Sequence, residues 1–177
     1  MTLCRNRFNT YFLCVLALAL VCGCQTEARK KKHAVSTLRL HLECSPYDTD
    51  RNQAVEIPRE HPSKIYVEKQ CFLTEANVAE AKVMSNLDGF VMTIQMDNRG
   101  KLWLEQYSAA NRGHRFAIYS QFGEKLATNR WLAAPVISRV IKDGTLMFTP
   151  DASRAEAEQI VLGLNNVAKK VQEKSDW

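Results

Sequence analysis

The first 24 residues constrain this chain more than any other stretch, because they decide how much of it is left to fold. Arg5 and Arg7 form a basic start, and an uncharged apolar run follows at residues 11–22. This run is too short for a bilayer-spanning helix, which takes about 20 residues. A basic start, a short apolar centre and small residues at its end are typical of a secretory signal peptide. We therefore expect residues 1–23 to be removed, which leaves 154 of the 177 residues to fold.

The apolar run ends in Val21-Cys22-Gly23-Cys24, which resembles the lipobox of bacterial lipoproteins. In that pattern, an aliphatic residue and a small glycine precede the cysteine that receives diacylglycerol. The resemblance implies a lipid anchor on Cys24, membrane attachment through that lipid, and a mature chain that faces the periplasm. Secretion without a lipid is the alternative. Gln25 stands where an aspartate signals inner-membrane retention in some bacteria, which favours the outer membrane.

Residues 24–36 come next and are polar without any periodicity. We expect them to form a tether between the anchor and the folded domain. Four consecutive basic residues, Arg29 to Lys32, lie within this stretch. They either contact anionic lipid headgroups or form part of a solvated linker, as most charge runs do.

Two cysteines, Cys44 and Cys71, remain in the mature chain besides Cys24. In an oxidising compartment, two such cysteines either pair or stay as thiols. Both lie at the ends of expected strands, which is compatible with pairing. A disulfide that closes this loop of about 27 residues would stabilise the fold by roughly 3 kcal/mol.

The composition is that of an ordinary globular domain. Apolar residues make up 46% of the chain and charged residues 24%, so we expect a continuous core. The formal charge is +5 for the whole chain, and it falls to +3 when Arg5 and Arg7 leave with the signal peptide. This excess is too small to indicate nucleic-acid binding. We therefore expect no nucleic-acid partner.

Strand-like and helix-like patterns alternate along the mature chain. Leu38, Leu40 and Leu42 alternate with polar residues as in a half-buried strand. The expected elements are strands at 38–43 and 64–69, a possible edge strand at 54–57, a helix at 75–82 after Thr74, a strand at 89–96, a helix from 97 to about 112 before Gly113, strands at 115–120, 131–137 and 145–148, and a helix from Ser153 with Ile160, Leu164, Val167 and Val171 along one side. This order favours an α+β fold with helices on one face of a mainly antiparallel sheet.

Several short motifs occur in a fixed order between Phe72 and Lys169. They are Leu73-Thr74, Ile94-Gln-Met-Asp97 followed by Gly100, Asn111 two residues before Gly113, Phe116-Ala-Ile118, Ala134-Pro-Val-Ile137, and Gly144 followed by the alanine-rich run 155–164. Their order and spacing resemble the head subdomain of the first periplasmic region of SecD and SecDF. We therefore expect residues 72–172 to form a head-like α+β domain, preceded by N-terminal strands and a loop at 37–71.

The resemblance implies a fold and, loosely, contact with polypeptides in the periplasm. The sequence also departs from the family pattern, because Ser108 replaces a common threonine, residues 120–129 look longer than the family's hairpin, and a glycine is missing near Phe148. SecD and SecDF couple proton flow to export through transmembrane helices, and this sequence has no stretch that matches them. We therefore expect no proton-driven transport by this chain.

No motif for catalysis or for metal binding is present. The mature histidines, His33, His41, His61 and His114, are scattered without ligand spacing. No phosphate-binding glycine loop follows a strand, and neither G-x-S-x-G nor H-E-x-x-H occurs. We therefore expect no enzyme activity, no cofactor and no metal, although a catalytic group assembled from distant residues stays an alternative.

The best candidates for a partner surface are aromatic residues that flank the enlarged hairpin. Tyr119, Phe122 and Trp131 are expected there, with Arg112 and Arg115 as a nearby basic cluster. The alternative is that the aromatic residues only cover the open face of the sheet. Together these features favour a lipid-anchored periplasmic module that binds polypeptides or export machinery. A structural outer-membrane-associated protein with one dedicated partner is the main alternative, and a hydrolase is a lesser one.

Overall fold

The computed structural model describes residues 31–47, 50–57, 63–87 and 89–175. The expected signal peptide at 1–23, Cys24 and the tether as far as Lys30 lie outside these described residues. The chain divides into two compact units, residues 1–33 and 34–177. Of the first unit, the structure describes only residues 31–33, which are helical. The second unit contains every element discussed below.

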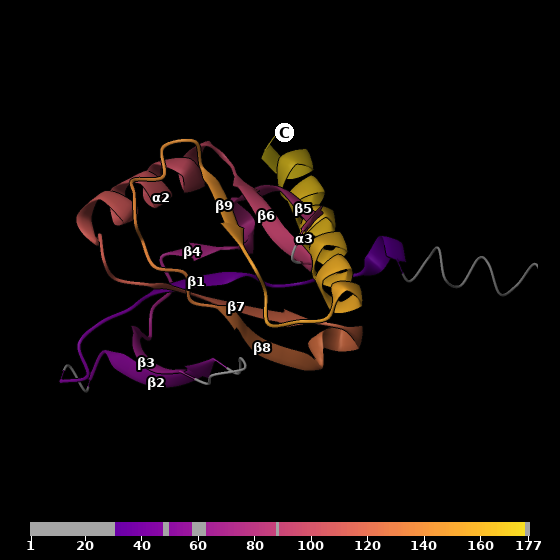
Figure 1. The fold of residues 1–177 in the computed structure, drawn as a ribbon. Helices are drawn as coiled ribbons and strands as arrows, with labels where there is room; N and C mark the ends of the chain where they lie inside the picture. Colours follow the sequence, from indigo (N-terminus) through magenta and orange to yellow (C-terminus); the bar gives the residue numbers. More distant parts are fainter. Residues whose placement is uncertain (1–30, 48–49, 58–62, 88, 176–177) are drawn as a thin grey trace, which may run out of the picture. The chain divides into compact units, whose positions relative to one another are not determined.

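The strands of the second unit form three antiparallel sheets (Figure 1). The four-stranded sheet has the order β4 (Leu73–Thr74), β1 (Arg39–Leu42), β7 (Phe116–Phe122) and β8 (Thr128–Ala133). The three-stranded sheet has the order β5 (Val78–Asn86), β6 (Gly89–Met96) and β9 (Thr145–Phe148), and β2 (Asn52–Ile57) pairs with β3 (Ser63–Glu68). The helices are α2 (Asn98–Ala110), α3 (Arg154–Ser175) and the 3-10 turns η1 (Glu75–Asn77) and η2 (Glu124–Leu126). The α+β antiparallel class is confirmed, with the strands divided among three sheets.

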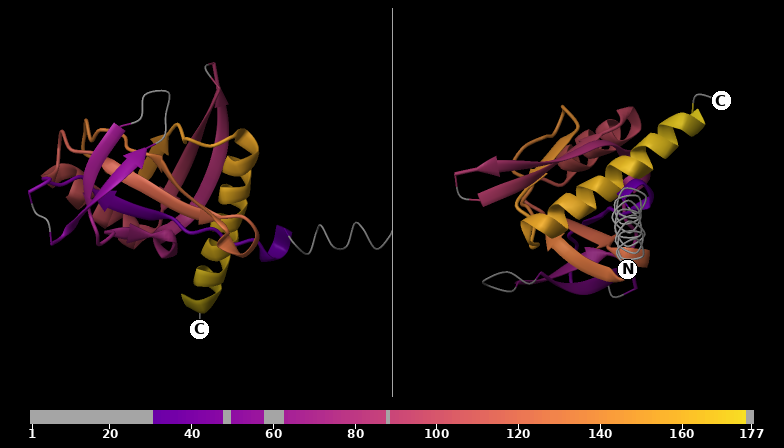
Figure 2. Two further views of the ribbon diagram at one scale, coloured as in Figure 1. Left: turned by 90° about the horizontal axis from the view of Figure 1, so that it is seen from below. Right: turned by 90° about the vertical axis from the view of Figure 1, so that its right-hand side faces the viewer.

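One hydrophobic core joins α3 to both larger sheets. Leu40 and Ile118 of the four-stranded sheet, Ile94 of the three-stranded sheet, and Ile160 and Leu164 of α3 are all fully buried in it. The β2–β3 hairpin lies on the other side of the four-stranded sheet (Figure 2). The apolar side predicted for the last helix therefore packs into the core in the first turns of α3, at Ile160 and Leu164. The last member of that row, Val171, is 38% exposed.

The helix ends follow local rules that the sequence already displays. Asp97 caps α2, because its side chain accepts a hydrogen bond of 2.6 Å from the backbone N–H of Gly100. Ser153 and Glu156 form a reciprocal pair at the start of α3, in which each side chain accepts a bond from the other's backbone N–H. Gly113 follows α2 with φ of +88°, a conformation that glycine adopts without strain.

The helix predicted at residues 75–82 is wrong. After the short turn η1, the chain enters β5, which pairs with β6 along its whole length. Val78 and Ala81 are buried in this strand, and a bulge between Val78 and Glu80 shifts its register. The good helix formers in this stretch are overridden, because tertiary pairing outweighs a weak local propensity.

The outer edge of β5 is closed by a side chain rather than by another strand. The amide of Asn165 on α3 accepts a hydrogen bond from the backbone N–H of Ala81 at 2.8 Å and donates one to its carbonyl at 3.0 Å. Asn165 therefore makes the two bonds that a neighbouring strand would make. This contact fixes α3 along β5 and covers a strand edge that would otherwise be open to pairing.

The end of the expected tether belongs to the folded unit. Ser36 is 1% exposed, and Thr37 donates its backbone N–H to the carbonyl of Gln121 at 2.9 Å. The Ser36 backbone crosses α3 at Gly163, where a Cβ atom would lie 2.5 Å from the Ser36 nitrogen. The tether prediction of 24–36 therefore runs too far, and the fold begins at Ala34. Likewise no boundary falls at residue 71, because β1 lies between β4 and β7.

Candidate functional site

The face of the four-stranded sheet that points away from α3 carries a row of polar and aromatic side chains. Arg39 on β1 lies opposite Tyr119 on β7, and Tyr119 lies opposite Trp131 on β8. Directly opposed residues in antiparallel strands share one face of the sheet. The rings of Tyr119 and Trp131 have centroids 5.1 Å apart and are tilted by 55°. A cation, a phenol and an indole therefore lie side by side across three strands.

The β2–β3 hairpin covers only part of this face. Its buried residues form a small second core with Ala117, against which Trp131 and Ala134 pack; the hairpin residues are Val55, Ile57, Ile65 and Val67. The part that stays open is a hollow of about 340 Å³. We call it the outer-face pocket, and its lining residues are Arg39, His41, Gln53, Lys69, Tyr119 and Trp131.

His41 is the most deeply buried of the residues that line the outer-face pocket, and it is 5% exposed. Its Nδ1 lies 2.8 Å from the backbone carbonyl oxygen of Glu68, so Nδ1 donates the proton and Nε2 is the acceptor. Burial lowers the pKa of His41, and the nearby Arg39 lowers it further, whereas the hydrogen bond to Glu68 and the Glu68 charge raise it. The ring also meets Trp131 edge-on at 5.3 Å. His41 is therefore a neutral group that supports the indole.

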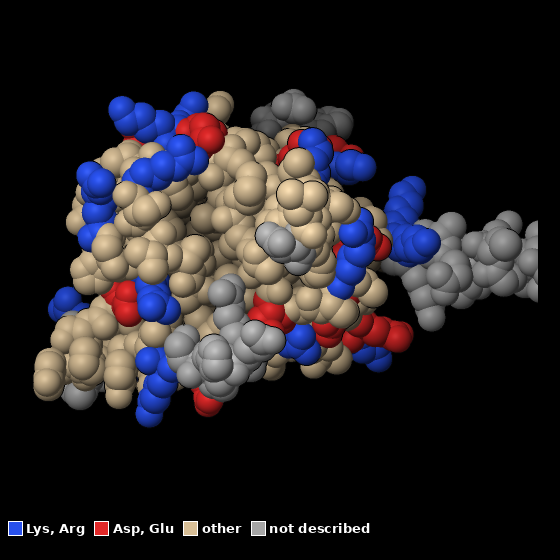
Figure 3. Space-filling view, in the orientation of Figure 1, with Lys and Arg blue, Asp and Glu red and all other residues tan. Residues whose placement is uncertain are grey.

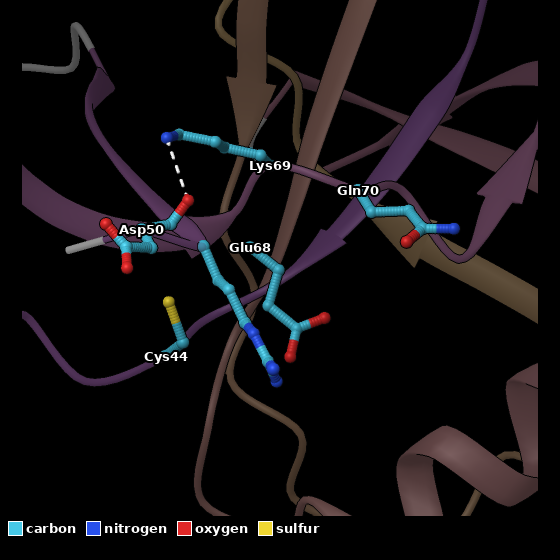
Figure 4. A pocket seen from close by; sticks show the side chains of 6 residues that line it. Cys44, Asp50, Glu68, Lys69 and Gln70 are labelled. Atoms are coloured by element: carbon cyan, nitrogen blue, oxygen red, sulfur yellow. Dashed lines mark hydrogen bonds between the residues drawn. The ribbon is translucent and has the colours of Figure 1, made fainter. Parts of the chain in front are cut away.

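The charges that line the outer-face pocket are all positive. Arg39 and Lys69 supply them, and none of the described lining residues is acidic. An adjacent pocket of about 460 Å³ differs in this respect, because Asp50 and Glu68 line it together with Arg51 and Lys69. Lys69 lines both pockets, and in Figure 4 its Nζ donates to the backbone oxygen of Asp50, at 3.0 Å. The adjacent pocket is therefore lined by two acidic and two basic side chains, whereas the charged residues that line the outer-face pocket are both basic.

The structure brings together two of the five residues predicted for a partner surface. Tyr119 and Trp131 are both half-buried and line the outer-face pocket. Phe122 was predicted wrongly, because it is 1% exposed and lies in the main core. The strand continues through Phe122, so this side chain falls on the same face as Phe116 and Ile118. Half of the enlarged hairpin at 120–129 continues β7 and β8, and residues 123–127 form the turn.

Arg112 and Arg115 lie elsewhere. Arg112 is exposed and donates to the carbonyl of Ser138 at 3.3 Å, while Arg115 forms an isolated bridge with Val136. Arg115 and Tyr119 are four strand residues apart, a distance of about 13 Å along the strand. Neither arginine lines the outer-face pocket, so the predicted basic cluster is not part of it.

Four pocket residues were not predicted as site residues: Arg39, His41, Gln53 and Lys69. The alternation of Arg39 and His41 with the buried leucines did indicate that they face away from the core. It did not indicate that a hairpin would cover part of that face and make a pocket beside them. Gln53 and Lys69 come from that hairpin and the residue after it, and no local pattern distinguishes them.

Cys44 and Cys71 are both half-buried thiols in the structure. Cys44 lines the adjacent pocket, as Figure 4 shows. Pairing of the two cysteines in an oxidising compartment stays a prediction. Within residues 31–47, 50–57, 63–87 and 89–175, no three His, Cys, Asp or Glu side chains are grouped to hold a metal ion. No helix in that same part of the chain is long and apolar enough to cross a membrane.

The fold defines the chain as an α+β domain with antiparallel sheets, and a family comparison makes this class specific. Residues 51–168 match the family model described as SecDF, P1 head subdomain, and the chain belongs to this family. No curated protein matches the chain significantly.

Two solved structures share the fold. One is described as a membrane component SecDF that enhances protein export. It is 20% identical, with a TM-score of 0.56, and the match covers 80% of this chain and 67% of that one. The other is SecDF in a super-membrane-facing form, 19% identical with a TM-score of 0.54, where the match covers 80% of this chain and 20% of that one. At these identities the likeness concerns the fold alone.

Proposed function

We propose that this chain is a lipid-anchored periplasmic module that binds polypeptides, with no catalytic or proton-driven transport activity of its own. The observation that carries the proposal is the outer-face pocket, which places Tyr119 and Trp131 beside Arg39 on an open sheet face. Tyr, Trp and Arg are the residues most enriched where proteins bind other proteins. A SecDF-type relative that enhances protein export supports polypeptides as the ligand class.

The pocket is suited to binding rather than to chemistry. Its histidine, His41, has Nδ1 bound to a backbone carbonyl instead of a carboxylate. None of the described residues that line the pocket is a serine or cysteine nucleophile next to this histidine. Aromatic rings flanked by cations can hold an extended chain without changing it.

Photo-crosslinking in cells tests the binding role. A photoreactive amino acid in place of Tyr119, in the full-length chain, is expected to trap many different polypeptides. The matched control is the same amino acid at Glu158, an exposed position on α3. Equal crosslinking at the two positions, or none at Tyr119, would contradict a binding role for the outer-face pocket.

The anchor is tested separately from the pocket. Cys24→Ala is expected to abolish incorporation of labelled palmitate and to release the domain from the membrane fraction. Cys22→Ala is the control, and it should keep the label because the acceptor cysteine is intact. Gln25→Asp is expected to move the protein towards the inner membrane in bacteria that sort lipoproteins by this position. Palmitate labelling that persists in Cys24→Ala would overturn the anchor.

A second candidate function, packing against one dedicated partner, is favoured by a different surface. On the outer side of the three-stranded sheet, Met84 is 48% exposed and Met147 is 57% exposed, and Val136, which lines a small hollow together with Met147, is also exposed. The middle of the face in Figure 3 carries few charged side chains, whereas Lys and Arg gather over α2. Exposed apolar side chains that gather on one face mark protein contact sites. A single stoichiometric crosslink at Met147, with none at Tyr119, would favour this alternative.

A further inference from the structure

Resting on the polypeptide-binding role proposed above, we infer that the outer-face pocket binds a carboxylate of the polypeptide, with Arg39 as its main partner. The pocket presents Arg39 and Lys69 beside the Tyr119–Trp131 pair, and no acidic residue lines it in the described part of the chain. The inference concerns which group of the ligand is recognised. It therefore goes beyond the fold and beyond polypeptide binding in general.

Arg39 is placed to take a ligand. It is exposed, and it lies directly opposite Tyr119 at the open end of the row, whereas Trp131 at the other end packs against the hairpin. The ion pairs of the described residues are Lys82–Glu80, Arg130–Glu156 and Arg154–Glu158, so none of them uses Arg39 or Lys69. A guanidinium in this position can form the two parallel hydrogen bonds that a carboxylate accepts.

No acidic side chain lines the outer-face pocket in the described part of the chain, and the acid whose charge reaches its histidine is Glu68. Glu68, which precedes Lys69 in the sequence, lines the adjacent pocket (Figure 4). The Lys69 ammonium donates to the backbone oxygen of Asp50 and keeps further donors, because a lysine has three. Two cations therefore share one pocket whose other polar groups are an amide, a phenol, an indole N–H and a neutral imidazole.

The polar groups of the pocket match a carboxylate that is attached to a peptide. Arg39, Lys69 and Gln53 offer donors to the carboxylate oxygens, while Nε2 of His41 is an acceptor for a peptide N–H. The Tyr119 and Trp131 rings give an apolar wall for the neighbouring side chain.

Fluorescence anisotropy on the full-length lipoprotein in detergent tests the inference. The probe is a labelled pentapeptide with apolar side chains and a single carboxylate at its C-terminus. Arg39→Gln is expected to weaken binding about tenfold or more, because a charge-assisted bond is lost, and Lys69→Gln is expected to weaken it less. Arg112→Gln is the matched control, since it removes an exposed arginine outside the pocket.

Two further peptides identify the source of the carboxylate. The first is the same pentapeptide with an amidated C-terminus, and the second is amidated but carries one internal aspartate. Loss of binding by both peptides assigns the site to a chain end, and retained binding by the second assigns it to an acidic side chain. Each result supports a carboxylate site.

Equal binding of the acid, amide and aspartate peptides, or no effect of Arg39→Gln, would overturn the inference. Crosslinking of polypeptides at Tyr119 would still support polypeptide binding in that case. The carboxylate inference can therefore be wrong while the proposed binding role is right. Because Arg39 is exposed, Arg39→Gln is expected to fold, and far-UV circular dichroism checks this.

Discussion

The two faces of the four-stranded sheet consist of alternate residues of the same strands. One face is packed into the core, and the other carries the outer-face pocket. On the inner face, Leu40 and Ile118 are fully buried against α3 and the three-stranded sheet. On the outer face, Arg39, Tyr119 and Trp131 are only partly covered by a short hairpin. Stability therefore depends on one face and the proposed recognition on the other. Neighbouring residues in one strand can be changed to affect one without the other.

The largest expected effect compares Ile118 with Tyr119, which are adjacent on β7 and point to opposite faces. Ile118→Ala removes a fully buried side chain and is expected to lower the free energy of unfolding by about 2–5 kcal/mol. Tyr119→Ala is expected to cost less stability, because the ring is only half-buried, yet to weaken peptide binding strongly. Urea unfolding followed by circular dichroism, with the anisotropy assay, measures both. Equal losses of stability in Ile118→Ala and Tyr119→Ala would contradict the view that the inner face alone determines stability.

The next effect concerns the close approach of α3 to the segment before β1. Gly163→Ala adds a methyl group where the Ser36 backbone lies, and is expected to destabilise the fold by about 1–3 kcal/mol through overpacking. Binding of the peptide probe should be unchanged, since the pocket is on the outer face. Ala155→Ser, at an exposed position of α3, is the control for thermal unfolding. A neutral or stabilising Gly163→Ala would show that this crossing is not tight.

A smaller effect is expected at the start of α3, the helix that covers the inner face. Ser153→Ala removes the hydroxyl that accepts the N–H of Glu156, and is expected to cost about 1 kcal/mol. Ser138→Ala, also exposed, should cost nothing measurable. Similar midpoints of urea unfolding for the two variants would contradict the importance of this cap.

The smallest effect lies on the outer face and depends on pH. Burial lowers the pKa of His41 below its ordinary value in the folded state, so the unfolded chain binds a proton first as pH falls. Stability is therefore complete above the ordinary histidine pKa and declines as pH falls towards the lowered one. Arg39 and Glu68 are the charges that act on this ring. His41→Asn should flatten this part of the stability profile, whereas His114→Asn, at an exposed site, should leave the slope unchanged.

Elements with a clear local pattern could be predicted from the sequence. The alternation in β6 and the helix starts expected at residue 97 and at Ser153 depend on side chains within a few residues, and the structure confirms each. The helix expected in place of β5 was wrong because its outcome depends on pairing with β6 and on Asn165, which is 84 residues away from Ala81. Long-range contacts of this kind leave no periodic trace.

The residues of the candidate site also fall into those that could be predicted from the sequence and those that could not. Tyr119 and Trp131 could be found as aromatic residues of one hairpin. Phe122 was misassigned because the strand is longer than its polar neighbours suggest. Gln53 and Lys69 reach the pocket only because the β2–β3 hairpin folds over the sheet, which depends on the second small core rather than on any local signal.

The crossing of residues 34–37 over α3 also determines how the domain would bear a mechanical load. Asn166 holds the carbonyl of Ala34, and Thr37 is bonded to Gln121 and Ser120 on β7. A force applied to the chain before Ala34 reaches β1, which is bonded on both sides by β4 and β7. Pulling along such a central strand shears many bonds together instead of opening them one at a time. A domain held by its N-terminal end, as the proposed lipid anchor would hold it, would thus resist being unfolded from that end.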